Sequence, residues 1–150
     1  MIALLQRVSA ASVIVSGEKI ASIEQGLLVL IGVEKADSMA SAQRLVERIL
    51  AYRVFADAQD KMNLSVTDIQ GGVLLVPQFT LAADTGSGMR PGFSTAASPT
   101  DAHQLFDSVV DIMRKHYALV ETGRFGADMA VELINDGPVT FWLQAKSEVK

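Results

Sequence analysis

The sequence contains no cysteine among its 150 residues. This excludes disulfide bonds, thiol nucleophiles and zinc sites with cysteine ligands, but it leaves the redox compartment open. Basic residues are also scarce, since 13 Lys and Arg stand against 17 Asp and Glu and give a net charge of −4. Broad binding to a nucleic-acid backbone depends on neutralising phosphates, so this charge balance argues against it while allowing a small basic site.

Long apolar runs are missing too. The longest, "GLLVLIGV" at 26–33, has the length of a buried strand and not the roughly 18 residues of a membrane span. The N-terminal segment lacks the basic start and long apolar region of a signal peptide, so we expect a cytoplasmic protein with no membrane partner. The length and the 49% of hydrophobic residues predict one globular domain over 1–150, with 145–150 as a frayed tail.

Residues for acid–base or metal chemistry are few. The two histidines, His103 and His116, are thirteen positions apart in a predicted helix, and we interpret both as surface or half-buried side chains. There is no zinc-binding spacing and no G-x-S-x-G elbow, so no metal and no cofactor are expected. The Gly-rich stretch 84–99 lacks a phosphate-loop pattern and predicts a long surface loop, in which Arg90 is a candidate for an anionic ligand.

Hydrophobic periodicity predicts many strands and two helices. Asp37 or Ser38 caps the first helix, and Ser98 with Pro99 begins the second. Strict alternation of strands and helices is absent, so a doubly wound parallel sheet is not expected. The fold class predicted is α+β: a curved, largely antiparallel sheet or open β-barrel with two main helices packed against it. The strands are expected in "IALLQRV", "SVIVSG", "EKIASIEQ", "GLLVLIGV", "YRVFAD", "GGVLLV", "ALVETG", "MAVELIND" and "VTFWLQ".

Two stretches are candidates for a functional site. In "VPQFTLAAD", composition alone makes Phe79 a core residue and Gln78 and Thr80 polar residues at a strand end, where they either edge the sheet or enter a cleft. "LINDGPVTFW" indicates a strand, a turn and a strand, with Gly137-Pro138 at the corner. Proline there has no N–H to donate to a strand, which makes the corner unusual.

These two stretches closely resemble the signature motifs of the D-aminoacyl-tRNA deacylases. The likeness extends from Met1 to about Gln144, with the motifs in the family's order. It also includes "MIALLQRVSAASVIV", "GLLVLIGVEK", "YRVFAD", "KMNLSV", "MRPGFSTAASP" and "TGRFGADMAVELINDGPVT".

The resemblance implies a small cytoplasmic homodimer that needs no cofactor. Such an enzyme hydrolyses the ester between a D-amino acid and the 3′-terminal ribose of tRNA, and it also releases glycine mischarged on tRNA(Ala). It further implies that Gly137-Pro138 is a cis dipeptide inserted into the partner's active site, where its backbone carbonyls exclude L-aminoacyl esters. The family's first motif is usually Ser-Gln-x-Thr, and this sequence has Pro77 in place of the serine.

The site residues follow from the same resemblance. Gln78, Phe79 and Thr80 are the expected catalytic residues, with backbone N–H groups around Phe79 and Thr80 as the oxyanion site. Thr80 is either the nucleophile or, as we favour, a residue that orients the substrate while the ribose hydroxyl helps to activate water. The substrate-binding residues implied are Pro77, Gly137, Pro138, Arg7, Phe125 and Met129.

Three other functions stay open at this point. A catalytically weakened tRNA- or nucleic-acid-binding relative is compatible with Pro77, which removes a hydroxyl and an N–H from the motif. A purely structural dimerising β-domain would leave the long polar loop and Gly137-Pro138 unexplained. A general esterase using Thr80 would cleave simple esters that lack a ribose hydroxyl.

Overall fold

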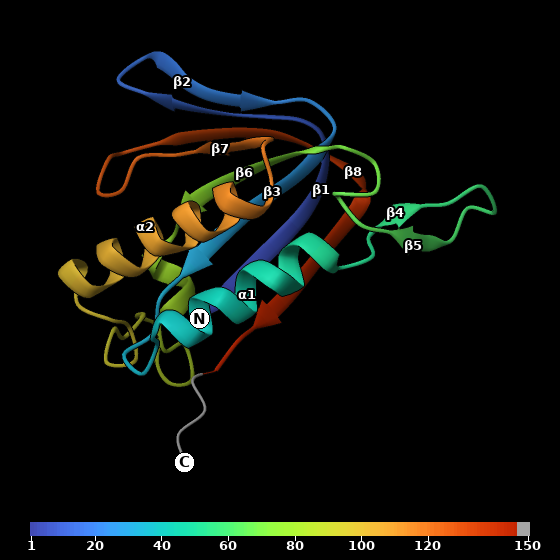
Figure 1. The fold of residues 1–150 in the computed structure, drawn as a ribbon. Coiled ribbons are helices and arrows are strands. Elements are labelled where there is room, and N and C mark those ends of the chain that lie inside the picture. The colour runs from blue at the N-terminus through green and yellow to red at the C-terminus, as the bar shows by residue number, and fades with distance from the viewer. Residues whose placement is uncertain (147–150) are drawn as a thin grey trace.

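The computed structural model describes residues 1–146 (Figure 1). Strands and helices alternate unevenly along the chain, as expected for an α+β protein. In chain order the elements are β1 (Ile2–Val15), β2 (Glu18–Ile23), β3 (Gly26–Gly32), α1 (Met39–Ala51), β4 (Phe55–Ala56), β5 (Met62–Leu64), β6 (Gly72–Pro77), η1 (Phe79–Ala82), α2 (Pro99–His116), β7 (Val120–Thr122) and β8 (Ala130–Gln144).

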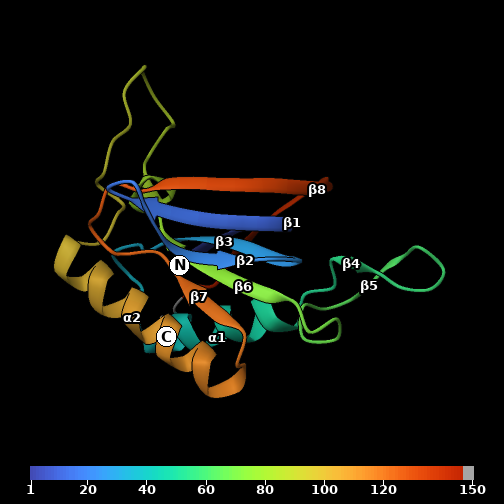
Figure 2. The ribbon, with the colours of Figure 1, turned by 90° about the horizontal axis from the view of Figure 1, so that it is seen from above.

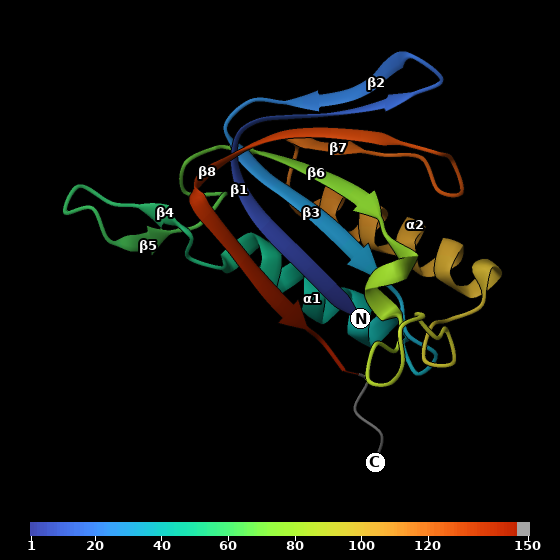
Figure 3. The same ribbon diagram turned by 180° about the vertical axis from the view of Figure 1, so that it is seen from behind.

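The main sheet is curved and mixed. Its strand order is β2-β1-β3-β6-β7, and β8 pairs with β1 outside this path. The pairs of β1 with β2, β3 and β8 are antiparallel, whereas β3–β6 and β6–β7 are parallel. The sheet curls so far that β2 also contacts β6 and β7 (Figure 3). The predicted α+β class and the two packed helices are confirmed, with a parallel part that the sequence analysis did not include.

Both helices cover the same face of the sheet (Figures 1 and 2). Ser38 is the N-cap of α1, and the Ser98 side chain accepts a hydrogen bond from the amide of Asp101 at the start of α2. Pro99 follows in the first turn of α2. A backbone N–H at this position would have no acceptor within the helix, so proline costs no hydrogen bond there. No helix among the described residues is long and apolar enough to cross a membrane.

The central strands β3 and β6 are apolar on both faces because each face covers a different core. Successive side chains of a strand point to opposite sides. Leu75 and Val73 of β6 pack with the helices, whereas Leu74 and Val76 pack on the other side inside the curl of the sheet. The helix-side core also contains Leu5, Leu27, Val29, Ile31, Leu45, Ile49, Phe106, Val109 and Met113.

Several predicted element boundaries are wrong. The two strands expected before residue 17 form one strand, β1, and the two expected after residue 130 form one strand, β8. Within "YRVFAD" only Phe55 and Ala56 are strand, and they pair with β5 in a short ribbon that projects from the body. Ala145 is not frayed, since it is buried and its amide donates to the Met1 carbonyl at 2.9 Å. The rest of the predicted tail, 147–150, lies outside the described residues.

Candidate functional site

The first motif lies at the carboxyl end of β6. Pro77 is the last residue of that strand and pairs with Ile31 of β3. The chain then turns into the short helix η1, and the Gln78 amide donates to the Ile31 carbonyl at 2.8 Å. Gly32 allows η1 to sit close to β3, because a Cβ at this position would come within 2.8 Å of the Leu81 Cβ.

Gln78 and Thr80 meet at the surface. The Gln78 side-chain amide donates a hydrogen bond to the Thr80 hydroxyl, so the two polar groups of the motif are coupled directly. Phe79 is 63% exposed, and its ring packs against Phe93 of the following loop with 5.4 Å between centroids. The assignment of Phe79 to the core from composition is therefore wrong: the η1 turn rotates this side chain outward.

Backbone donors also gather at this point. The first hydrogen bond at the start of η1 runs from the Leu81 amide to the Gln78 carbonyl at 3.2 Å. The amides of Phe79 and Thr80 precede that bond, and the first N–H groups of a helical turn have no acceptor within the turn itself. These two N–H groups therefore lie next to the Gln78–Thr80 pair.

The loop 83–98 is fastened to the same end of the sheet. The Thr95 hydroxyl donates to the Ala82 carbonyl at 2.7 Å, and the Ala97 amide donates to the Val33 carbonyl at 3.0 Å. Figure 2 shows the loop reaching beyond the sheet on the side opposite to the helices. Met89 at the far part of the loop is fully exposed, and Arg90 beside it is exposed as well.

Met129 lies close to Pro77, and Phe125 lies in the same loop as Met129. They belong to the loop that joins β7 to β8. A Cβ at Gly123 would lie 2.8 Å from the Met129 sulfur and 3.5 Å from the Pro77 Cδ, so these residues are close neighbours. The structure therefore brings five predicted residues together at one end of the sheet: Pro77, Gln78, Phe79, Thr80 and Met129. The sixth, Phe125, lies in the same loop as Met129.

Gly137 and Pro138 form an extruded bulge within β8. Between the paired positions Gln6–Thr140 and Val8–Asn135, β1 has one residue whereas β8 has the four residues 136–139. The Gly137-Pro138 peptide is cis, and both residues are exposed. The Asn135 side chain closes the bulge by accepting from the Val139 amide at 3.0 Å. The predicted turn between two strands is thus an outward loop of one continuous strand.

Arg7 supports this bulge from beneath. Its Nε donates to the Asp136 carbonyl at 3.0 Å, and its Nη1 donates to the Val54 carbonyl at 2.8 Å. The guanidinium also lies 3.5 Å from the Asp136 carboxylate. A Cβ at Gly137 would come within 3.1 Å of Arg7, so a larger residue would press on its support. Arg7 therefore lies against the bulge that contains Gly137 and Pro138.

The two groups of predicted residues are far apart within one chain. Arg7 pairs with Leu27 of β3, whereas Pro77 pairs with Ile31. Four residues along a strand correspond to about 13 Å, and the three strand spacings from β8 to β6 add about 14 Å across the sheet. Figure 3 shows the bend of β8 and η1 at opposite ends of the strands.

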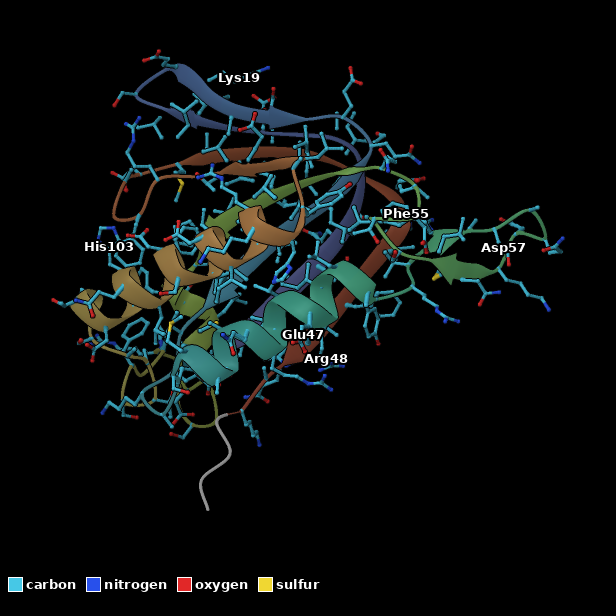
Figure 4. The ribbon with its side chains drawn as sticks, viewed as in Figure 1. Lys19, Glu47, Arg48, Phe55, Asp57 and His103 are labelled. Carbon is cyan, nitrogen blue, oxygen red and sulfur yellow. The ribbon has the colours of Figure 1, made fainter. Side chains whose placement is uncertain are left out.

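Other polar features lie away from the motif. Two surface hollows of about 540 and 320 Å³ are lined by residues other than Gln78 and Thr80. Hydrogen bonds from Asn63 and Lys61 lower the pKa of Asp57, which lies on the projecting β4–β5 ribbon (Figure 4). No group of three His, Asp or Glu side chains within residues 1–146 is placed to hold a metal ion.

Comparison with known proteins shows the family of this chain. The family model of D-Tyr-tRNA(Tyr) deacylase matches residues 4–144. The chain belongs to this family. A D-aminoacyl-tRNA deacylase of Xanthomonas oryzae pv. oryzae is 61% identical over 96% of this chain and 99% of its own. One of Erwinia tasmaniensis is 58% identical over 96% of this chain and 99% of its own.

Two solved structures share the fold of this chain. A structure named c-Myc DNA Unwinding Element Binding Protein has a TM-score of 0.94 and 39% identity, and the match covers 98% of this chain and all of that one. A second structure, of a probable eukaryotic D-amino acid tRNA deacylase, has a TM-score of 0.84 at 15% identity over 95% of this chain and 97% of its own. At that identity the second match supports the fold alone.

Sequence reasoning missed three contributors to this region. Phe93 packs on Phe79, Gly32 admits η1, and His103 of α2 stacks on Phe125 with 4.5 Å between ring centroids. His103 was expected to be an ordinary helix side chain, and its 54% exposure agrees with that expectation, but its ring partner was not foreseen. Nothing in the local sequence signals a contact between residues 22 positions apart on different elements.

Proposed function

We propose that this protein is a D-aminoacyl-tRNA deacylase, which hydrolyses the ester between a D-amino acid and the 3′-terminal ribose of tRNA. The observation that carries the proposal is the match to D-aminoacyl-tRNA deacylases over nearly the whole chain, with the motif residues Gln78 and Thr80 joined at the surface. Glycyl esters on tRNA(Ala) are a second substrate in this proposal. Cytoplasm is the compartment in which such a substrate is found.

The active unit is a homodimer in which Gly137-Pro138 of one protomer enters the site of its partner. The separation of the two groups within one chain supports this, because a single protomer cannot bring the bulge to Thr80 without breaking the sheet. Within residues 1–146, β8 pairs only with β1, and it exposes apolar side chains that a second copy would cover. These side chains are Leu133, Ile134 and Trp142.

The inserted dipeptide acts as a filter for chirality. Its backbone carbonyls occupy the place into which the side chain of an L-amino acid would project, so an L-aminoacyl ester clashes. A D-amino acid directs its side chain elsewhere, and glycine has none to reject. Because the filter consists of backbone atoms, it accepts D-amino acids with different side chains. Arg7 and Asn135 support this role by fixing the bulge on both sides.

Hydrolysis proceeds by attack of water on the ester carbonyl. The amides of Phe79 and Thr80 stabilise the oxyanion of the tetrahedral intermediate. The neighbouring ribose hydroxyl helps to activate the water. Collapse of the intermediate then expels the ester oxygen of the ribose, which takes up the proton that the water has given up. Thr80 orients the substrate in this scheme. The partner of its hydroxyl is the Gln78 amide, which is not a base that could activate a nucleophile.

A binding protein without turnover is the second candidate. The structural relative with 39% identity is named for DNA binding, and Pro77 replaces a motif serine here. The overall charge of −4 weakens this candidate, because non-specific affinity for nucleic acid rests on phosphate contacts.

Deacylation of D-tyrosyl-tRNA, L-tyrosyl-tRNA and glycyl-tRNA, measured side by side, tests the proposal. We expect loss of the D-tyrosyl and glycyl esters while the L-tyrosyl ester persists. Loss of all three would overturn the filter, and loss of simple D-amino-acid esters without ribose would favour a general esterase. Binding of tRNA without hydrolysis of any ester, by a folded dimer, would favour the binding protein.

A further inference from the structure

The loop 123–129 between β7 and β8 has few fixed points in its own backbone. At its start the Gly123 amide donates to the Leu75 carbonyl at 2.8 Å. Within the loop, the Ala127 amide donates to the Arg124 carbonyl at 3.3 Å, and the Arg124 amide lies 3.4 Å from the Met129 sulfur. Pro77 has no N–H to offer this loop from the end of β6. The position of Phe125 therefore depends on its side chain, which packs against the helix-side core and contacts two other rings.

Those ring contacts come from α2. Phe106, which is 3% exposed, lies 6.4 Å from the Phe125 ring, and His103 stacks on Phe125 at 4.5 Å with 6° between the planes. The three rings run from the core to the surface, with His103 outermost, and Figure 4 shows His103 between α2 and the loop. One turn further along α2, Asp107 lies 3.4 Å from the His103 Nε2 and orients the imidazole.

We propose that His103 is a positioning residue for the substrate site, acting through Phe125. By stacking on Phe125, His103 holds the loop 123–129 against the end of β6, where Met129 meets Pro77. The inference rests on the proposed function, in which Phe125 and Met129 form the wall beside Thr80. A loop that is ordered before the substrate arrives loses less entropy on binding, so His103 should act on KM and leave kcat nearly unchanged.

The test compares His103→Ala with His103→Tyr and His116→Ala in D-tyrosyl-tRNA hydrolysis. Replacement by alanine removes the stack, and we expect KM to rise by about two- to tenfold, the range of one aromatic pair. His103→Tyr restores a flat ring and should return KM close to the wild-type value. His116 is an exposed residue at the other end of α2, and His116→Ala should change neither parameter.

A double variant shows whether His103 acts through Phe125. In Phe125→Leu, the further change His103→Ala should have little effect, because its partner ring is already missing. If the effects of the two changes on the logarithm of KM were fully additive, the proposal would be overturned. An unchanged KM in His103→Ala, or a fall in kcat alone, would overturn it as well.

A measurement without substrate separates this inference from the proposed function. In the wild-type protein, the Phe125 ring should shift the imidazole proton resonances of His103 upfield, and nuclear Overhauser contacts should join the two rings. These signals should disappear in Phe125→Leu while the chain stays folded. If the wild-type protein shows the stack but does not hydrolyse D-tyrosyl-tRNA, the proposed function fails. If it hydrolyses the ester and His103→Ala matches it in KM, only the role of His103 fails.

Discussion

The end of β6 and the bulge of β8 are built in opposite ways. At the end of β6, the motif is anchored by regular pairing with β3 and by a close approach over Gly32. In β8, the residues 136–139 leave the ladder altogether, and side chains of Arg7 and Asn135 hold them. The first region is a continuation of the core, whereas the second is a projection from an edge strand.

This difference supports the proposal that the two parts meet between two chains. A strand end that faces outward beside an open loop forms a receptive surface with hydrogen-bond donors. In the proposed dimer, the exposed bulge of the partner fits into such a surface. Because the sheet holds the two apart in one protomer, the proposed dimer needs a second copy to bring them together, and in that proposal each protomer supplies one half to each of two sites.

Hybrid dimers test this division most directly, with the largest expected effect. Thr80→Glu blocks the motif of one protomer with a charged side chain but leaves its bulge intact. Gly137→Ala distorts the bulge of the other, because its φ of +136° disfavours any residue with a Cβ and that atom would lie 2.6 Å from Val139. A dimer of the two variants then contains one site with an intact motif and an intact bulge, contributed by different chains.

We expect this hybrid to hydrolyse D-tyrosyl-tRNA at up to half the wild-type rate and to spare L-tyrosyl-tRNA. Thr80→Glu alone should be inactive, and Gly137→Ala alone should accept the L ester. If the bulge acted within its own chain, the intact motif of the hybrid would sit with the distorted bulge and the hybrid would also cleave the L ester. The readout is the ratio of D to L hydrolysis after tandem purification with two different tags.

Removing the support of the bulge should have the next largest effect. Arg7→Met deletes the donors to Asp136 and Val54, so the bulge loosens and discrimination between D- and L-tyrosyl-tRNA falls. Unfolding free energy should drop by about 1–3 kcal/mol because carbonyl groups lose their partners. Arg44→Met is the matched control, since that guanidinium is 65% exposed on α1. Unchanged discrimination in Arg7→Met would mean that the bulge needs no support from Arg7.

Substitution of Thr80 distinguishes two mechanisms of ester hydrolysis at the end of β6. If Thr80 orients the substrate, Thr80→Ala loses one hydrogen bond and should lower kcat/KM by about 2- to 12-fold. A nucleophile would give near-total loss instead. Thr80→Val keeps the volume of the side chain, so agreement between the alanine and valine variants would exclude lost packing as the cause. Single-turnover hydrolysis of D-tyrosyl-tRNA measures all three proteins.

The sequence predicted the fold well where local pattern and tertiary contacts agree. The apolar run 26–33 is a central strand buried on both faces, and Ser38 and Ser98 cap the two helices. The predicted breaks in β1 and β8 are wrong because these strands pair with each other over almost their whole length. That pairing is a long-range property, and it overrides the local turn signal of Asp136, Gly137 and Pro138.

The candidate site shows the same limit of prediction from sequence, because its long-range contacts are not encoded in local patterns. Gln78 and Thr80 were identified by motif, and the structure joins them. Phe79 was assigned to the core because composition cannot report the direction in which a short helical turn rotates a side chain. The stack of His103 on Phe125 depends on the docking of α2 beside the loop 123–129, which no pattern within either segment encodes.

The salt dependence of tRNA binding should show the smallest effect, and it distinguishes Arg7 of one region from Arg90 of the other. Arg7 is engaged beneath the bulge, whereas Arg90 lies exposed in the loop that follows η1. With tRNA held mainly by its 3′ end, the logarithm of affinity should fall only shallowly with the logarithm of salt concentration, by about 0.7 for each single-stranded phosphate contact. Arg90→Gln should reduce that slope by about one contact, and Arg44→Gln should leave it unchanged. A steep slope in the wild-type protein would instead indicate an extended phosphate interface, which the few basic residues of this chain do not lead us to expect.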